Sequence, residues 1–312
     1  MPANAAHRNL AVVAVAVAAA LTAAHGTAGA SSIPGGADDG PVFTLLDAGD
    51  PANTVDVGAA TPSVGDAAVR TTVATATGTM ELTGSAELSV VVDQVTEYVE
   101  SLEVLEFADD GAYTTQRRVE SYDYTDRGTP AVGGFASDEE LETLVGLDLT
   151  YVYGTERRLV TIDADPAVVL TAEQQTAIDE LIATDSPEPL ASIDTALGEG
   201  ARVVIEMSSP AGDATIPVEL TVTAIDDESF TVEAGFAGDV AELYGEPPEG
   251  FDTVSGEYTA TITGTRAIDD PLVATSTMTV EMYVELSGPD NHAVIDVILV
   301  EEQASVRTGS AR

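Results

Sequence analysis

The sequence predicts an α+β protein that is mainly β, with a long curved antiparallel sheet and a few helices packed on one side. Three observations predict this class. Short segments rich in Val, Thr, Ile, Tyr and Phe follow one another and are separated by Gly and Asp pairs. In many of them apolar and polar residues alternate, which is typical of an antiparallel sheet with one buried face. Helix-start signals lie between two strand-rich halves.

The strands are the clearest elements of the sequence. Three hairpins are predicted, over 99–120, 216–236 and 257–285, because acidic residues followed by Gly, Ser or Pro interrupt each apolar run. The apolar members of the best alternating segments are Val203, Ile205 and Met207; Ile216, Val218, Leu220 and Val222; Phe230, Val232, Ala234 and Phe236; Met278, Val280, Met282 and Val284; and Ile295, Val297 and Leu299.

Two capping boxes predict helices in the middle of the chain. Ser137–Glu140 opens the first, which ends at Gly146, and Thr171–Gln174 opens the second, which continues through Ile182. A third, shorter helix is expected over 189–197. These helices are expected to cover the concave side of the sheet.

The first 30 residues have the pattern of a secretory signal peptide. Arg8 precedes an apolar run from Leu10 to about Ala24, and Ala28-Gly29-Ala30 matches a cleavage site. The run barely reaches the ~20 residues of a membrane-spanning helix, so cleavage is favoured over anchoring. We therefore expect a secreted, extracytoplasmic protein.

The rest of the chain divides by composition into an arm, one domain and a tail. Residues 31–66 predict a flexible acidic linker, in which the apolar segment 42–46 is expected as a docked edge strand. Residues 67–302 predict a single β-rich globular domain, and 303–312 a disordered tail. A recurring Ala-Ile-Asp-Asp motif indicates that the domain consists of two related halves, 67–165 and 200–301.

Charge is the strongest compositional signal. The net charge is −43, and every basic side chain is Arg, since the chain has no Lys. Phosphate backbones and anionic membrane surfaces repel such a chain, which excludes nucleic-acid binding. We interpret the acidity as an aid to solubility or an adaptation to salt, in preference to a dedicated cation site.

The residue inventory excludes several kinds of catalysis. The chain has no Cys and no Lys, and His292 is the only histidine beyond residue 30. Cysteine nucleophiles, Schiff-base lysines and multi-histidine metal sites are therefore excluded. His292 lies in a turn-like stretch and is interpreted as a solvent-facing residue. We expect no enzyme, although the many acidic residues leave open a hydrolase that uses carboxylates alone.

No cofactor or metal site is expected from the motifs present. Calcium needs only oxygen ligands, so weak calcium binding at acidic loops is the one alternative. The best such loops are Asp109-Asp110, Asp123 with Asp126, and Asp226–Glu228, and none matches a calcium-loop pattern. Turn formation is the favoured role of these acids.

A ligand cavity, if the sheet encloses one, has identifiable candidate residues. Apolar members of the strands and of the first helix would line it, with ordinary core packing as their alternative role. These candidates are Phe230, Val232, Phe236, Met278, Val280, Met282, Leu141 and Leu144.

Two arginine doublets, 117–118 and 157–158, are candidates for contact with an anion. Adjacent strand residues point to opposite faces, so each doublet places one Arg on each side of the sheet. We take Arg118 and Arg158 as the anion-contact candidates. Ion pairs with neighbouring glutamates are the alternative role.

Two segments carry a resemblance to known proteins. Leu102–Thr115 (LEVLEFADDGAYTT) reads as strand, Asp-Gly turn and strand, and Leu144–Asp163 (LVGLDLTYVYGTERRLVTID) as a helix end and a hairpin, with Gly146 and Gly154 at the turns. Over about 100–260 this order resembles exported bacterial half-barrel proteins, which are similar in shape to lipoprotein carriers and mycobacterial lipid-binding lipoproteins. The resemblance implies a half-barrel sheet with an apolar ligand cavity. The chain lacks the lipobox Cys of lipid-anchored members, so a fixed position at the membrane is not implied.

Together these observations predict an exported, non-catalytic binding protein that holds a hydrophobic or amphiphilic ligand, such as a lipid, against the curved sheet. The alternative is a ligand-free structural or protein-interaction module of the cell exterior. The two differ in whether the concave face surrounds a ligand or a filled core.

Overall fold

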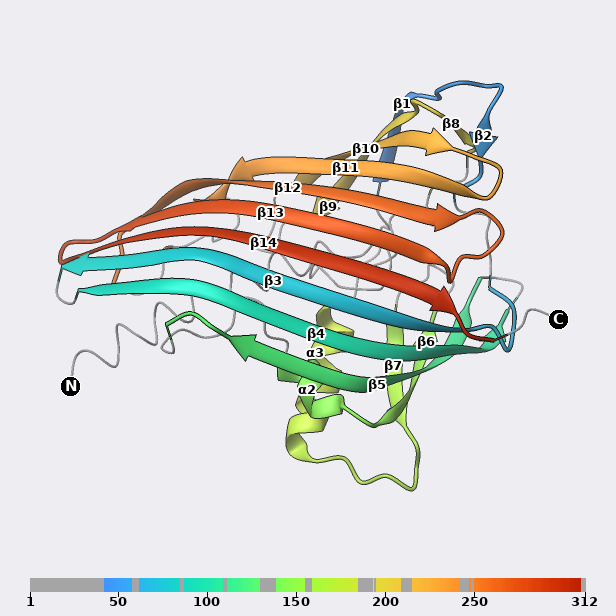
Figure 1. The fold of residues 1–312 in the computed structure, drawn as a ribbon, viewed down its shortest axis with the longest axis horizontal. Coiled ribbons are helices and arrows are strands. Elements are labelled where there is room, and N and C mark those ends of the chain that lie inside the picture. Colours follow the sequence, from blue (N-terminus) through green and yellow to red (C-terminus); the bar gives the residue numbers. More distant parts are fainter. Residues whose placement is uncertain are drawn as a thin grey trace.

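One large antiparallel sheet organises the protein, as the computed structural model shows (Figure 1). The described residues are 42–57, 62–84, 87–108, 111–129, 139–154, 159–184, 193, 195–208, 215–241, 247 and 250–309. The predicted class, mainly β with a long curved antiparallel sheet and few helices, is confirmed.

The sheet has twelve strands and is open, with β1 and β7 at its edges. In spatial order these are β1 (Val42–Asp47), β9 (Arg202–Ser208), β10 (Thr215–Ile225), β11 (Ser229–Asp239), β12 (Thr253–Ala267), β13 (Ala274–Ser287), β14 (Asn291–Arg307), β3 (Ala67–Gly84), β4 (Leu88–Phe107), β5 (Tyr113–Asp126), β6 (Asp148–Tyr153) and β7 (Leu159–Ala164). A second, two-stranded sheet pairs β2 (Thr54–Val55) with β8 (Leu197–Gly198).

Most neighbouring strands follow one another in the chain. The three predicted hairpins are present as β4–β5, β10–β11 and β12–β13. Two pairings in this sheet are distant in sequence: β1 pairs with β9, and β14 lies along β3, from Asn291 opposite Gly84 to Arg307 opposite Ala68. The β14–β3 pairing joins the two strand-rich halves into one continuous surface.

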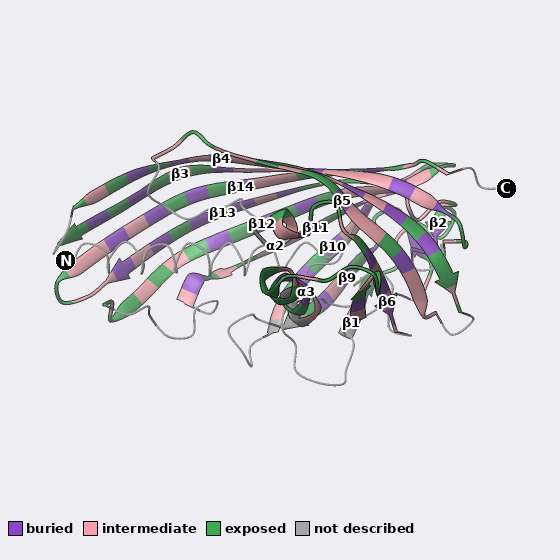
Figure 2. Ribbon diagram, turned by 90° about the horizontal axis from the view of Figure 1, so that it is seen from below, coloured by how far each residue is buried: buried purple, intermediate pink, exposed green. Residues whose placement is uncertain are grey.

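The alternating sequence pattern explains how the sheet is buried. On β13, Met278, Val280 and Met282 are buried, whereas Thr277 before them and Glu281 between the last two are exposed. Figure 2 shows that the sheet arches over α2 (Glu139–Leu144) and α3 (Ala172–Thr184). The buried residues therefore form the inner, concave face, and the polar residues form the outer face.

The two described helices lie at one end of the arch. The Thr171 hydroxyl accepts a hydrogen bond from the Gln174 amide at 3.2 Å, and the Gln174 side chain accepts one from the Thr171 amide at 2.9 Å, so the predicted capping box is formed. The helices pack on each other and lie against β5 and β7. Neither is long and apolar enough to cross a bilayer. The helix expected over 189–197 falls largely outside the described residues, and Leu197 belongs to β8.

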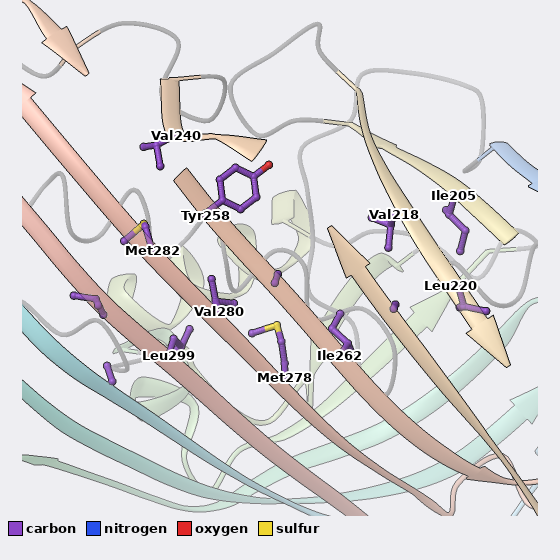
Figure 3. Close-up of a cluster of buried hydrophobic side chains, with 14 of the residues drawn as sticks. Ile205, Val218, Leu220, Val240, Tyr258, Ile262, Met278, Val280, Met282 and Leu299 are labelled. Carbon is purple, nitrogen blue, oxygen red and sulfur yellow. The ribbon is translucent and has the colours of Figure 1, made fainter. Parts of the chain in front are cut away.

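Buried apolar side chains form two cores. The larger one (Figure 3) takes residues from β3, β4 and β9–β14, together with Val55, Val57, Ile193, Leu197 and Val240. The smaller one contains Leu144 of α2, Ile178 of α3 and the inward residues of β6 and β7. Among the described residues, α2 and α3 contribute no buried side chain to the larger core, whereas the helical residue Val240 does.

The folded unit extends beyond the boundaries predicted from composition. Within the predicted arm 31–66, β1 forms the expected edge strand, and Val55 and Val57 are buried in the larger core. Within the predicted tail 303–312, β14 continues to Arg307. The predicted signal peptide, 1–30, lies outside the described residues.

Candidate functional site

The inner face of the sheet changes character along the central strands. On β3 it passes from Arg70 and Thr72 at one end to Met80 and Leu82 at the other. The inner faces of β4 and β14 change from polar to apolar in the same direction, because the pairing registers place the apolar residues of neighbouring strands side by side. The apolar end includes Val90, Val92, Ala293, Ile295 and Val297, and the polar end includes Thr96, Glu100, Gln303 and Ser305. Beyond Arg70 and Glu100 the inward residues Ala68, Leu102 and Val104 are buried and apolar again.

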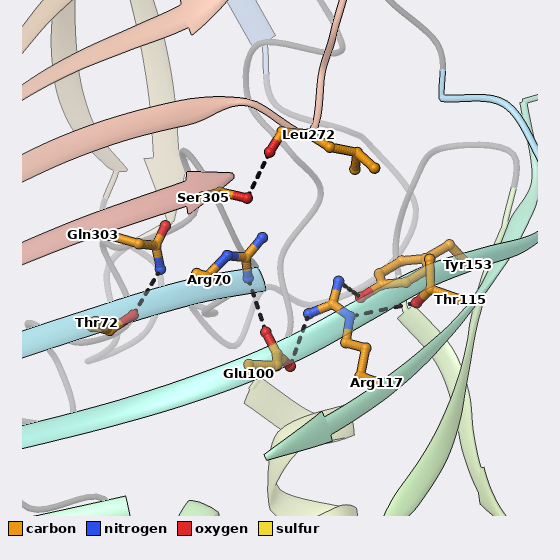
Figure 4. Close-up of polar contacts among 9 residues, drawn as sticks. All are labelled: Arg70, Thr72, Glu100, Thr115, Arg117, Tyr153, Leu272, Gln303 and Ser305. Carbon is orange, nitrogen blue, oxygen red and sulfur yellow. Dashed lines mark hydrogen bonds and ion pairs between the residues drawn. The ribbon is translucent and has the colours of Figure 1, made fainter. Parts of the chain in front are cut away.

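Two arginines share one carboxylate at the polar end (Figure 4). Arg70 on β3 donates a hydrogen bond from Nη1 to Glu100 Oε2 on β4 at 3.3 Å, and Arg117 Nη1 on β5 lies 3.8 Å from Glu100 Oε1. The side chains of Arg70, Glu100 and Arg117 are 14, 10 and 11% exposed. These three residues, called here the Arg70–Glu100–Arg117 triad, carry a net charge of about +1 on the inner face.

Aromatic residues of β5 and β6 hold Arg117 in place. Its Nη2 donates a hydrogen bond to the Tyr153 hydroxyl at 2.7 Å, and its guanidinium carbon lies 4.7 Å from the centre of the Tyr151 ring. Tyr113 stacks on Tyr153 with ring centres 4.3 Å apart. These contacts combine a hydrogen bond with a cation–π interaction.

The electrostatic surroundings keep Arg117 charged. Burial by itself lowers its pKa, but Tyr153, Glu100 and Tyr151 raise it, and the net shift of the pKa is upward. The guanidinium is therefore a permanent cation within a mostly apolar interior.

The polar end continues across β14. Gln303 donates a hydrogen bond to the Thr72 hydroxyl at 3.3 Å, and Ser305 donates one to the Leu272 carbonyl at 2.6 Å (Figure 4). Arg307 donates to both Asp66 and Asp270 at 3.1 Å, which fixes the end of β14. These residues extend the polar surface beyond the triad.

The predicted lining residues divide between the two cores. Phe230, Val232, Met278, Val280 and Met282 are buried in the larger core, and Phe236 packs against it. Leu144 is buried in the smaller core, and Leu141 is half-buried on α2. The strand residues therefore share one surface, from which Leu144 is separate. Their proposed role as ligand contacts stays a prediction.

The first arginine doublet divides between the two faces, as predicted, but Arg117 is the inward member. Arg118 lies on the outer face, 40% exposed, and forms ion pairs with Glu120 at 3.3 Å and Asp148 at 3.2 Å. Arg158, the other anion-contact candidate, lies outside the described residues.

A β-bulge explains why Arg117 was missed. The register shifts between Val99 and Glu100, which leaves Glu120 as an extra residue on β5. Inward positions are therefore odd-numbered up to Val119 and even-numbered from Tyr122 onward. The switch from Val119 to Tyr122 in the sequence is the signal that could have revealed it.

The acidic loops show turn chemistry. Asp226 accepts hydrogen bonds from the backbone amides of Glu228 at 2.8 Å and Ser229 at 2.6 Å, and these contacts lower its pKa. Within the described part of the chain, no three His, Asp or Glu side chains gather as a metal site. The loop at Asp109-Asp110 lies outside that part.

Comparison with known proteins identifies no family. No family model matches the sequence, and no curated protein matches it. Among solved structures, one describing lipid–protein interactions in lipovitellin aligns with a TM-score of 0.38 and 12% identity, over 80% of this chain and 26% of that one. This chain thus spans about a quarter of the length of that protein.

Two bacterial outer membrane proteins align with lower scores. The outer membrane protein OprG of Pseudomonas aeruginosa has a TM-score of 0.23 and 8% identity, over 79% of this chain and 97% of that one. The COG4313 outer membrane channel of Pseudomonas putida F1 has a TM-score of 0.22 and 7% identity, over the same shares, 79% and 97%. Likenesses at these scores carry no inference about function.

Proposed function

We propose that the protein is an exported, non-catalytic binding protein that holds a hydrophobic or amphiphilic ligand against the inner face of its sheet. The observation that carries this proposal is the continuous apolar surface from β9 through β14 to β3 and β4, opposite which α2 and α3 place no buried side chain. The residues of this face are at most 9% exposed in the chain alone, so the face is covered within the chain. A lipid-like molecule would take the place of part of that cover.

The dimensions of the inner face fit such a ligand. On β3 the apolar end runs from Ala76 to Leu82, which at about 3.3 Å per residue is about 20 Å. A bilayer core of about 30 Å contains two acyl layers, so one acyl chain extends about 15 Å. One chain therefore fits lengthwise along the strand.

The position of His292, the one histidine beyond residue 30, supports a non-catalytic role. The His292 ring lies 2.9 Å from Glu285 across the β13–β14 hairpin, and both side chains are more than 40% exposed, at 44 and 43%. The pair lies at the surface, away from the triad, where it ties two strands together. No catalytic step is needed to account for it.

Native extraction tests the proposal. The protein is purified in salt from a secreting bacterial host, extracted with organic solvent, and the extract analysed by mass spectrometry. We expect one apolar or amphiphilic molecule per chain. The control is the same protein unfolded in urea and desalted before extraction, which should yield none. Two results together would refute the proposal: the native sample yields no more extracted molecule than this control, and added dodecanol does not raise the melting temperature of the protein.

One observation favours a second candidate, a ligand-free structural or protein-interaction module. Val284, Leu286 and Ile295 are 0% exposed in the chain alone, so the protein itself covers them. The extraction separates the two candidates, because a filled core needs no bound molecule.

A further inference from the structure

The inner face carries a local positive charge, whereas the protein as a whole is strongly negative. The whole chain has a net charge of −43, yet the Arg70–Glu100–Arg117 triad sets two guanidinium groups against one carboxylate. Buried charges are usually paired or neutralised, because an unpaired charge costs several kcal/mol by order of magnitude. Within the triad the second positive charge has no carboxylate of its own, and the neighbouring cluster of Arg307 with Asp66 and Asp270 carries about −1.

The hydrogen-bonding capacity of the triad points the same way. The Nε of Arg70 is buried and makes no hydrogen bond within the described chain. Arg117 approaches Glu100 at 3.8 Å, which is an ion pair and not a close hydrogen bond. Guanidinium groups with unused N–H donors are suited to the planar, two-oxygen acceptors of carboxylates and phosphates.

The surrounding residues place these donors next to apolar surface. On β3 the inward residues that follow Arg70 are Thr72, Ala74 and Ala76, which lead into the larger core. From Arg70 to Leu82 the strand spans about 40 Å at about 3.3 Å per residue. Ala76, Met80 and Leu82 are 0, 1 and 4% exposed in the chain alone, so an amphiphile with its head at the triad would extend its tail along β3 by displacing what covers this face.

We propose that Arg70 and Arg117 bind the oxyanion head group, a carboxylate or a phosphate, of an amphiphile whose tail lies on the apolar end of the inner face. This inference rests on the proposed function and adds the chemical class of the ligand. Neutral amphiphiles bind less tightly, because they leave the second guanidinium unpaired.

The overall negative charge of the protein makes a measured preference for anionic amphiphiles informative. A net charge of −43 repels anions on average, so it does not produce a general preference for them. Any preference for an anionic over a neutral amphiphile of equal chain length must arise from a local site.

The test is calorimetric titration of the full chain at pH 8 in salt with three probes of equal tail: dodecanoate, dodecyl phosphate and dodecanol. We expect at least one anion to bind about 10–100-fold more tightly than dodecanol, as expected for hydrogen bonds to charged groups. The tighter anion identifies the head group. The variants Arg117→Gln and Arg70→Gln are each expected to remove this preference for the anion over dodecanol.

Arg118→Gln is the matched control, because it removes the same charge from the adjacent residue on the outer face. It should preserve the preference. Arg70→Gln keeps the test decisive if Arg117→Gln does not fold, as checked by circular dichroism. Equal binding of all three probes, or an equal loss in Arg118→Gln, would overturn the head-group inference alone. Failure of every probe to bind would overturn the proposed function as well.

Discussion

Replacing Glu100 with Gln is the most direct test of the triad as a structural element. The substitution preserves the shape of the side chain and removes the carboxylate that lies 3.3 Å from Arg70 and 3.8 Å from Arg117. Two buried guanidinium groups would then face each other without a counter-charge. We expect the free energy of unfolding to fall.

The size of the effect follows from burial. Removing one partner of a buried ion pair costs about 3–5 kcal/mol. All three side chains keep 10–14% exposure, and Gln retains one acceptor oxygen, so we expect about 3 kcal/mol. This is a large share of the about 5–15 kcal/mol that stabilises a typical protein.

Urea unfolding in salt measures this loss, since urea leaves the ionic strength unchanged. Glu120→Gln is the control, because Glu120 pairs with Arg118 at 3.3 Å but is 44% exposed, and its loss should cost no more than about 1 kcal/mol. A cost below about 1 kcal/mol for Glu100→Gln, or equal costs for the two variants, would refute the assignment of a buried triad.

Three further predictions concern the fold. On β12, Gly256 has φ +137° and a Cβ there would overlap the Tyr283 carbonyl, whereas a Cβ at Gly264 would lie 3.7 Å from Val232. By urea unfolding, Gly256→Ala should therefore lower the free energy of unfolding by about 2 kcal/mol or more, and Gly264→Ala by less than about 1 kcal/mol. Equal losses for the two variants would contradict the strand geometry. The turn contacts lower the pKa of Asp226 below 3.8 in the folded state, so its contribution to stability is present above pH 3.8 and is lost as the pH falls through the folded pKa. Asp226→Asn should flatten that part of the acid unfolding curve, and an unchanged curve would count against the turn contacts. Because the net charge is −43, dilution of salt should lower the urea midpoint as screening lengthens from ~8 Å toward ~30 Å, and a midpoint independent of salt would show that self-repulsion is unimportant.

The sheet was predictable because its signals are local. Alternation with a period of two, interrupted by acidic turns, identified the β10–β11 and β12–β13 hairpins and the inward positions of Met278 and Val280. The helix start at Thr171 was equally local, since the capping box lies within four residues. Each of these features depends on neighbours in the sequence alone.

The candidate site was less predictable because it depends on distant pairings. Arg70, Glu100 and Arg117 meet only because β3, β4 and β5 pair in one register, and the extra residue Glu120 decides which arginine of the doublet points inward. A one-residue change of phase moves every following side chain to the other face. Strict alternation through β5 would put Arg118 on the same face as Tyr122.

Variants of the triad can distinguish a structural role from a binding role, because its members have opposite charges. A buried ion triad adds little to stability compared with apolar residues of similar size, so stability alone gives no reason to retain it. Glu100→Gln raises the net charge of the triad from about +1 to about +2, and Arg117→Gln lowers it to about 0. If the triad is only structural, both variants lose stability and neither changes the preference for an anion. If it binds a head group, affinity for dodecyl phosphate rises in Glu100→Gln and falls in Arg117→Gln, although both variants are less stable. Opposite changes in affinity with parallel changes in stability are the result expected for an anion bound at the arginines.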